Sequence, residues 1–561
     1  MPEAARLVWL DEADAKNPAM VGAKASRLAK ARAEGLPVLD GFVVPVDISL
    51  PAVSAGEAVL RSTDNSGAAR SAVFNRQPPL LLQDLALEAT RRLGDTLVVR
   101  SSSRAEAESL WAGAFSSYLG MRPQDLIQGV IGCWASIFNP STLERGRVVG
   151  TPPSDVGMAV LVQPEIRPSS GGVAALGENG TVTVISTRGH PAGLVSGRER
   201  GHVASITRDG SVKGDSSSLG ARLLHRIADL TRSVAKAIRC NHIEWAADQE
   251  GNLHLLQAQC RVDPRDEGMR TQVPHQAQRG EPWMAEAVRM MIRWPGPMGE
   301  KFVWRWAIGL RDLSPASGGQ LRAQVATLAE EVHSGASMLM SQRWRGESLH
   351  KVESAWTELV GGDGPPLGDL ISRSPSVDRQ LAAKHLRTLE FLGDALTEAE
   401  VIPHLGWMWY LDPDTLDPAP PKLPGPMRRV GTTKWDPWIY GVITALGEPV
   451  SGTPAAGGWG VGRFRFIRNA EDAARFCPRE VIVASHPVGN IAPLLWNAAG
   501  LVTEGGSPGA HLFEVAGWLG VPALCGVDLR HRAVEARRRS EQKENPLVAV
   551  DGNAGRLTLL A

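Results

Sequence analysis

The chain has 561 residues, with 60 basic and 60 acidic side chains that give a formal net charge of zero, and 43% of its residues are hydrophobic. This length favours roughly three to four domains, and the balanced charge without a Lys/Arg block argues against nucleic acid as a partner. No apolar run is long enough to cross a bilayer, and the N-terminus lacks a secretory pattern, so we expect a cytoplasmic protein without a membrane partner. The five cysteines have no metal-ligand spacing, and we expect them to be reduced and mostly buried.

The first half of the chain places cationic side chains on a predicted helix and at the end of a predicted strand. Residues 21–28 place Lys24 in a helix, where an exposed lysine is usually solvated. Residues 97–103, Leu-Val-Val-Arg-Ser-Ser-Ser, predict a buried strand that opens into a hydroxyl-rich loop after Arg100. The Arg100 guanidinium can bind phosphate oxygens through two N–H groups. The alternative is an arginine that only caps carbonyl groups at the strand end.

Residues 242–259 predict an antiparallel hairpin, because two alternating segments flank a polar turn that contains glycine. If Asp248 and Leu253 close this turn, Glu244 lies opposite Gln257, with Cβ atoms about 4.5–5.5 Å apart. A carboxylate and an amide oxygen at that separation can share Mg²⁺, which takes one or two protein oxygens beside nucleotide phosphates and water. An ordinary cross-strand polar pair is the alternative.

Two linkers enclose a middle segment. The periodic pattern lapses over residues 262–282, and residues 412–426 are dense in proline, which suits a semi-rigid arm. Between them, residues 284–310 and 381–405 predict mainly helices, and the eight tryptophans of this region either line an apolar pocket or, by roughly two to one, fill a core. The candidate bases there, by location only, are His333, His350, His385 and His404.

Near the C-terminus, one histidine stands between a glycine turn and a helix. Residues 501–503 end a predicted strand, Gly505 and Gly506 form a sharp turn, and apolar spacing from Leu512 to Gly520 predicts a helix. His511 therefore lies in the first helical turn, where free N–H groups and the helix dipole favour a bound phosphate. The alternative is a polar histidine that only begins a helix.

Together these segments resemble the phosphoenolpyruvate-utilising enzyme family. Residues 21–44 and 97–120 resemble its ATP-grasp nucleotide-binding domain, and residues 242–259 resemble its Ile-Glu-Trp and Leu-Gln-Ala motifs. Residues 447–463 resemble the opening glycine-rich turn of its swivelling phosphohistidine domain, and residues 480–523 resemble the rest of that domain.

The resemblance implies an α/β multidomain protein. Its parts are an ATP-grasp ATP-binding domain over residues 1–265, a mostly helical acceptor-binding domain over 266–428 and a C-terminal swivelling β/α phosphohistidine domain over 429–561. The resemblance also implies Mg²⁺ or Mn²⁺ as the cofactor, ATP as co-substrate and His511 as the catalytic phosphoryl carrier.

The family motifs assign further roles to individual positions. The implied ATP-binding residues are Lys24, Arg100, Ser101, Ser102, Gln163, Gln259 and Arg261, the implied metal ligands are Glu244 and Gln257, and the implied phosphohistidine loop contains Gly505, Gly506, Ser507 and Gly509. Ala510 stands where the family usually places Ser or Thr, and Gln259-Cys260 stands where it has Arg-Pro. We interpret His486 as structural or as a minor substrate contact, and we assign no catalytic role to residues 189–197, where the family's Glu is replaced near Ala192.

The implied function is an ATP-dependent dikinase-type phosphotransferase. His511 attacks the β-phosphorus of ATP, AMP and phosphate are released, and the remaining phosphoryl group passes to a small-molecule acceptor, such as an antibiotic or a secondary metabolite. The domain order is similar to that of the family's rifampin phosphotransferase branch, because too little chain follows the swivelling motif for a pyruvate-binding barrel of about 250 residues. The alternatives are the ATP and phosphohistidine subunit of a split phosphoenolpyruvate synthase, and a relic that binds nucleotide without turnover.

Overall fold

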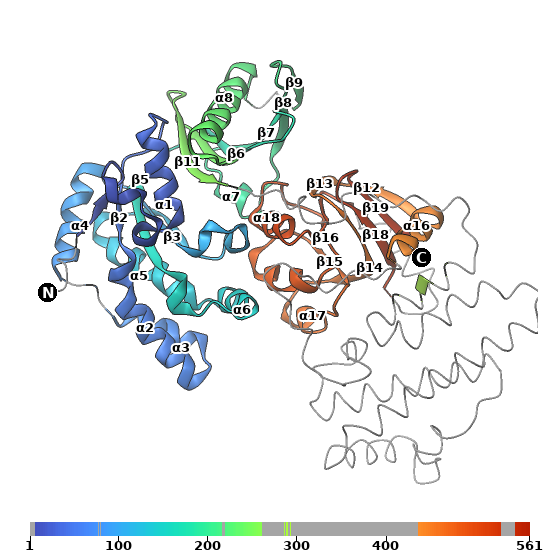
Figure 1. Ribbon diagram of the computed structural model, residues 1–561, viewed down its shortest axis with the longest axis horizontal. Coiled ribbons are helices and arrows are strands. Elements are labelled where there is room, and N and C mark those ends of the chain that lie inside the picture. Colours follow the sequence, from blue (N-terminus) through green and yellow to red (C-terminus); the bar gives the residue numbers. More distant parts are fainter. Residues whose placement is uncertain are drawn as a thin grey trace, which may run out of the picture.

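The computed structural model describes residues 6–260, 436–528 and 545–560, except 77, 79 and 216–218, together with residues 285, 288, 289 and 292. Arg261 and almost all of the predicted middle domain, including its tryptophans and candidate histidines, lie outside the described residues. Figure 1 shows an N-terminal half with two sheets facing a C-terminal body with a third sheet. Within the described residues, every helix is too short or too polar to traverse a bilayer.

The first sheet of the N-terminal half has five strands in the order β1-β2-β5-β3-β4. Its strands are β1 (Val8–Trp9), β2 (Phe42–Val44), β3 (Leu97–Ser103), β4 (Ser117–Met121) and β5 (Met158–Pro164). Its helices are α1 (Pro18–Ala33), α2 (Val46–Thr63), α3 (Ser66–Phe74), α4 (Leu80–Leu93), α5 (Leu126–Ala135) and α6 (Pro140–Val149). The strand β5 is buried from Met158 to Gln163. Residues 158–162 are all apolar, because helices α1, α2 and α5 pack against this strand.

The prediction of a hydroxyl-rich loop after Arg100 is wrong. Strand β3 continues to Ser103, because its three serines pair with residues 158–160 of β5. All three serines are buried. Arg100 is therefore an interior strand residue, and its orientation is fixed by ladder hydrogen bonds on both sides.

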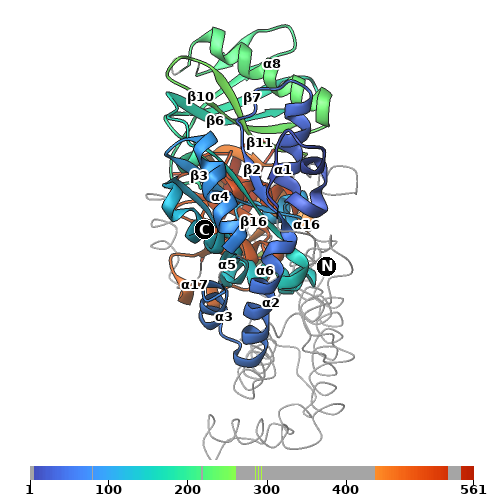
Figure 2. The same cartoon turned by 90° about the vertical axis from the view of Figure 1, so that its left-hand side faces the viewer.

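The second sheet has six strands in the order β11-β10-β6-β7-β8-β9. Its strands are β6 (Ser170–Leu176), β7 (Val182–Arg188), β8 (His202–Ile206), β9 (Val212–Gly214), β10 (His242–Ala247) and β11 (Leu253–Gln259). The helix α8 (Ala221–Ile238) covers it with Leu224, Ile227, Thr231 and Val234, which recur at helical spacing and are buried. In Figure 2 this sheet and α8 lie above the first sheet.

The β10–β11 hairpin confirms the predicted pair but not the predicted turn. Glu244 is opposite Gln257, as expected, whereas Ala247 pairs with Leu253, so the ladder begins one residue away from the turn we predicted. A β-bulge between Glu244 and Trp245 restores the register by giving β11 one extra residue, Leu256. The bulge frees the Leu256 carbonyl group, which accepts a hydrogen bond from Arg100.

The same hairpin corrects the prediction that all cysteines are reduced. Cys240 and Cys260 form a disulfide. They flank the paired ends of the hairpin, where His242 lies opposite Gln259, so the strand register itself brings the two thiols together. The free cysteines are Cys133 and Cys525, which are buried, and Cys477, which is partly exposed.

The C-terminal body is built on an eight-stranded sheet in the order β12-β19-β18-β14-β15-β16-β17-β13. Its strands are β12 (Glu448–Ser451), β13 (Thr453–Ala456), β14 (Trp459–Phe466), β15 (Val481–Ala484), β16 (Gly500–Thr503), β17 (Ala523–Cys525), β18 (Leu547–Asp551) and β19 (Arg556–Leu560). Its helices are α16 (Asp436–Leu446), α17 (Ala470–Ala474), the 3₁₀ helix η12 (Gly489–Asn497) and α18 (His511–Trp518). The predicted strands at 480–484 and 501–503 are confirmed, whereas residues 447–463 form three strands instead of a turn.

An apolar interface joins the N-terminal half to the C-terminal body. The short helix η3 (Ser109–Trp111) packs against α18, and α6 packs against η12. Leu110 and Trp111 belong to the same buried cluster as Leu512 and Phe513 of α18. This interface places the start of α18 beside the ends of β10 and β11, where the cavity described next lies.

Candidate functional site

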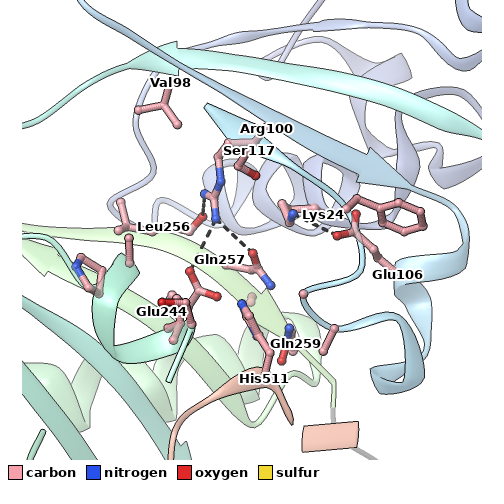
Figure 3. Close-up of a pocket in the computed structure, with 18 of the residues that line it drawn as sticks. Lys24, Val98, Arg100, Glu106, Ser117, Glu244, Leu256, Gln257, Gln259 and His511 are labelled. Atoms are coloured by element: carbon pink, nitrogen blue, oxygen red, sulfur yellow. Dashed lines mark hydrogen bonds and ion pairs between the residues drawn. The ribbon is translucent and has the colours of Figure 1, made fainter. Parts of the chain in front are cut away.

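A cavity of about 370 Å³ lies where the two sheets of the N-terminal half meet the C-terminal body. We call it the junction cavity. The residues of interest on its wall are Lys24, Arg100, Glu106, Gly113, Gln163, His190, Glu244, Gln257, Gln259 and His511. Figure 3 shows that Arg100, Glu244, Gln257 and His511 point toward one another across it.

A kink in α1 turns Lys24 toward the cavity. Gly22 has a φ of 73°, and a Cβ atom there would lie 1.8 Å from the Ser102 carbonyl oxygen, so only glycine lets α1 approach β3 this closely. The Lys24 Nζ atom donates to the Ser101 carbonyl oxygen at 2.9 Å and to Glu106 Oε1 at 3.1 Å. Lys24 is only 7% exposed, so it is not the solvated surface lysine of the alternative reading.

Arg100 connects the two sheets of the N-terminal half. From β3, its guanidinium donates to Gln257 Oε1 at 3.0 Å and to the Leu256 carbonyl oxygen, and it lies 3.5 Å from Glu244 Oε2. The alternative prediction, an arginine that binds carbonyl groups, is therefore partly confirmed. The carbonyl group that Arg100 binds belongs to Leu256 on β11 of the second sheet, not to its own strand. The guanidinium also faces the cavity, where it can bind an anion.

Glu244 and Gln257 form a pair of oxygen donors on the cavity wall. Both are nearly buried, at 7% and 8% exposure, and their side chains leave adjacent strands. Among the described residues, no group of three or more His, Cys, Asp and Glu side chains could hold a metal by itself. A carboxylate and an amide oxygen suffice for Mg²⁺ only when phosphate oxygens complete its coordination.

The remaining predicted nucleotide contacts divide into two groups. Gln163 and Gln259 line the cavity, and Gln163 Nε2 donates to the Leu39 carbonyl oxygen at 3.1 Å. Ser101 and Ser102 do not line it. The Ser102 hydroxyl group donates to the Val21 carbonyl oxygen and accepts from the Ala25 N–H, so it holds α1 in place.

His511 is the first residue of α18, as predicted, and it reaches the junction cavity. Ala510, the residue before the helix, gives no side-chain cap. Gly505, Gly506, Ser507 and Gly509 form the preceding loop and are not part of the cavity wall. A Cβ atom on Gly506 would lie 2.4 Å from Pro487, and one on Gly509 would lie 2.5 Å from Val173, so this loop packs closely within the body and onto the second sheet.

The charge around His511 is set by residues from both halves of the molecule. Burial lowers the pKa of His511, but Glu514 and Glu244 raise it by more, so the net shift is upward, with Lys24 opposing it. The Nδ1 atom of His511 lies 3.7 Å from Glu514 Oε2, longer than a hydrogen bond. The side chain of His511 is 22% exposed, which leaves part of the ring open to a ligand in the cavity.

Sequence reasoning missed four residues of this site. Gly113 contacts His511, Glu106 pairs with Lys24, and Glu514 faces His511. His190 lies in the segment to which we assigned no catalytic role, yet it lines the cavity, and burial and Arg100 lower its pKa. The spacing of three residues from His511 could have identified Glu514, whereas the other three depend on tertiary contacts.

His486 lies away from the cavity, next to the glycine turn before α18. A Cβ atom on Gly505 would lie 2.8 Å from His486 Nε2, so the imidazole ring packs directly against this turn. His486 does not line the junction cavity. This placement agrees with its interpretation as a structural residue.

Two family models match the chain. Residues 18–201 match the pyruvate phosphate dikinase AMP/ATP-binding domain, and residues 476–555 match the mobile domain of PEP-utilising enzymes. The first match contains Lys24, Arg100 and Gln163, and the second contains His511. The matches therefore include wall residues from both sides of the junction cavity, whereas Glu244, Gln257 and Gln259 lie outside them.

Curated relatives match over parts of their length. The rifampicin phosphotransferase of Streptomyces sviceus is 31% identical over 252 residues, which is 40% of this chain and 29% of that protein. A probable phosphoenolpyruvate synthase of Archaeoglobus fulgidus is 26% identical over 30% of this chain and 25% of its own length. Its counterpart in Methanocaldococcus jannaschii is 27% identical over 34% and 19%. The matched segments span less than a third of each relative.

A solved structure, the D-alanine-D-alanine ligase from Coxiella burnetii, is similar at 13% identity over 42% of this chain and 45% of that chain, with a TM-score of 0.20. A likeness this low carries no argument about the fold. The two family models are more informative, because both match the same chain, with the nucleotide-binding domain before the mobile domain. Two segments of the chain are therefore similar to domains of phosphoenolpyruvate-utilising enzymes, the first to an AMP/ATP-binding domain and the second to a mobile domain.

Proposed function

We propose that this protein is an ATP-dependent dikinase-type phosphotransferase in which His511 carries the phosphoryl group. One observation carries the proposal: His511, from the mobile domain, enters the same cavity as Lys24, Arg100 and Glu244 from the nucleotide-binding half. A carrier must meet the donor nucleotide directly, and this geometry supports such a meeting without further movement.

Different residues of the cavity would bind the phosphates, the base and the metal ion of Mg²⁺-ATP. Arg100, which is partly buried, and Lys24, which is buried, supply positive charge for the phosphates, and the apolar side chains of Val98, Phe115 and Leu256 offer a wall for the base. The carboxylate of Glu244 and the amide oxygen of Gln257 would hold Mg²⁺, which when bound neutralises phosphate charge. We further propose that residues 1–265 form an ATP-grasp domain and residues 429–561 a swivelling domain.

The proposed reaction has two displacements. The neutral imidazole of His511 attacks the β-phosphorus of ATP, the bond to the α-phosphate oxygen breaks, and AMP leaves with that electron pair. Water then releases the outer phosphate, and the remaining phosphoryl group passes to an oxygen or nitrogen of a small-molecule acceptor. We place the acceptor in residues 266–428 and the reaction in the cytoplasm, where ATP is available. Two displacements let one histidine serve two substrates that never share a site.

The position of the label in ATP tests this scheme. Protein is incubated with Mg²⁺ and ATP labelled at either the β- or the γ-phosphate, without acceptor. The scheme predicts that β-label stays on the protein, γ-label is released as phosphate and AMP forms in proportion. His511→Asn should abolish all three outcomes, whereas His486→Asn, a histidine of the same domain outside the cavity, should leave them intact. Retention of γ-label after ADP release would replace the dikinase scheme with ordinary kinase chemistry.

The same experiment separates the two alternatives. A subunit of a split phosphoenolpyruvate synthase would also label His511, but it would discharge the label only when pyruvate and a second protein are added. A relic without turnover would bind ATP and give neither AMP nor labelled protein.

A further inference from the structure

We propose that Glu514 is the positioning residue of His511: it holds the imidazole with its Nδ1–H toward the carboxylate and leaves Nε2 facing the junction cavity as the nucleophile. This inference rests on the proposed function of His511. It goes beyond that function because it names the group that decides which nitrogen reacts.

The first support is the placement of the two side chains on α18. Glu514 lies three residues after His511, a spacing that puts both on the same helix face. Its Oε2 atom is 3.7 Å from His511 Nδ1, and this Nδ1 atom is shielded from solvent. Since Nδ1 faces a carboxylate, the other ring nitrogen, Nε2, is left for the cavity that the ring lines.

The second support is the burial of the carboxylate. The Glu514 side chain is 1% exposed at the interface between the mobile domain and β10. A carboxylate there requires a positive or hydrogen-bonding partner, because an uncompensated buried charge is strongly unfavourable. Two imidazole rings lie near this carboxylate: His511, and His242, whose Nδ1 atom lies 3.9 Å from Glu514 Oε1.

The two histidines differ in how they would move. His511 and Glu514 share one helix, so they stay together when the mobile domain leaves the nucleotide. His242 belongs to β10 and stays behind. The orientation of the His511 ring is therefore kept throughout the proposed cycle, whereas the His242 contact exists only while the domain is docked.

A neutral imidazole carries its proton on one nitrogen, and only the bare nitrogen is a nucleophile. In water both tautomers are populated, and a hydrogen-bond acceptor beside one nitrogen selects the form with its proton there. A carboxylate in this place also favours the protonated ring. Among the described residues, the charged groups that shift the pKa of His511 are Glu514 on its own helix, Glu244 on β10 and Lys24 on α1. Arg100 on β3 also points toward it across the cavity (Figure 3).

The test compares Glu514→Gln with the wild type in two independent measurements. The first is the single-turnover rate of His511 labelling by Mg²⁺-ATP across pH. We expect the high-pH plateau to fall roughly ten- to hundredfold, less than the loss of about 10⁴ when a hydrogen-bonded triad carboxylate becomes an amide, because 3.7 Å is a longer contact. We also expect the acid limb to move to lower pH, because the variant loses a negative charge beside the ring.

The second measurement is the NMR titration and tautomer state of His511 in the protein without nucleotide. It does not need turnover, so it separates this inference from the proposed function. If the wild type is never labelled on His511, the carrier function fails, and the titration still decides whether Glu514 controls the ring. An unchanged midpoint and an unchanged tautomer in Glu514→Gln would overturn the inference, whatever the labelling shows.

Two further variants control for folding. Glu514→Asp keeps the carboxylate and lengthens the contact, so its plateau should lie between those of Glu514→Gln and the wild type. Glu471→Gln removes a glutamate on α17 that is 70% exposed and pairs only with its helix neighbour Arg475 among the described contacts, so it should match the wild type in both measurements. Equal losses in Glu514→Asp and Glu514→Gln would show that packing, and not the charge, is responsible, and would also refute the inference.

Discussion

Replacement of Gly113 by alanine should hinder the approach of His511 to the nucleotide site. Gly113 has a φ of 62°, and a Cβ atom there would lie 2.9 Å from His511 Cδ2 and 3.0 Å from His511 Cβ. Two separate penalties follow. The left-handed backbone costs an alanine about 1 kcal/mol in every state of the protein, whereas the collision with His511 exists only when the mobile domain is docked.

The collision sets the effect on the reaction. Forcing an extra methyl group into a packed contact costs about 1–3 kcal/mol. Since each 1.4 kcal/mol is a factor of ten, His511 labelling should slow by roughly 5- to 150-fold. Rapid-quench labelling with saturating Mg²⁺-ATP measures this rate. Equilibrium binding of ATP to the same variant shows whether its affinity for ATP falls by less than its labelling rate.

The chain offers a matched control for this variant. Gly150, at the end of α6, has a φ of 71°, and a Cβ atom there would meet nothing within 4 Å. Gly150→Ala therefore has the backbone penalty without the collision, and it should label His511 at the wild-type rate. Equal rates for Gly113→Ala and Gly150→Ala would refute the reasoning, because the docked contact would then carry no weight.

Three further predictions concern the cavity and the interface. Arg100→Lys should slow His511 labelling by roughly ten- to hundredfold, because one ammonium group cannot donate in the fork geometry of a guanidinium; a rate within twofold of wild type would contradict this. Arg145→Met should lower the free energy of unfolding by about 2–4 kcal/mol in a urea titration, since the buried guanidinium of Arg145 donates to three carbonyl oxygens, one of them that of Gly489 across the interface. The labelling rate should rise with pH through a midpoint above the 6.5 of a free imidazole, because the pKa of His511 is raised and only its neutral form attacks; a midpoint below 6.5 would be inconsistent with the observed charge around the ring.

The local elements of the site could be predicted from the sequence. The strand at 501–503, the glycine turn and the helix that begins at His511 follow from apolar spacing and turn residues alone. The opposition of Glu244 and Gln257 was also predicted, although by a turn that differs from the observed one. It survived because the extra residue of β11 at the bulge, Leu256, compensates for a turn that is one residue longer than predicted.

The tertiary parts of the site could not be predicted. The bulge at Leu256 is coupled to Arg100, a residue more than 150 positions away, whose hydrogen bond uses the freed carbonyl group. The contact of Gly113 with His511 joins segments on separate domains, and no local pattern marks it. Ser102 shows the opposite error: its hydroxyl group looked suited to phosphate, but it is used to hold α1 in place.

The most direct test of the account is whether His511 itself becomes phosphorylated. Purified protein is incubated with Mg²⁺-ATP and no acceptor, and its intact mass is compared at neutral and acid pH, with peptide mapping and nucleotide analysis alongside. The account predicts an acid-labile phosphoryl group on the peptide that contains His511, with AMP formed in proportion. No label on that peptide, or a label that persists in His511→Asn, would contradict the central claim.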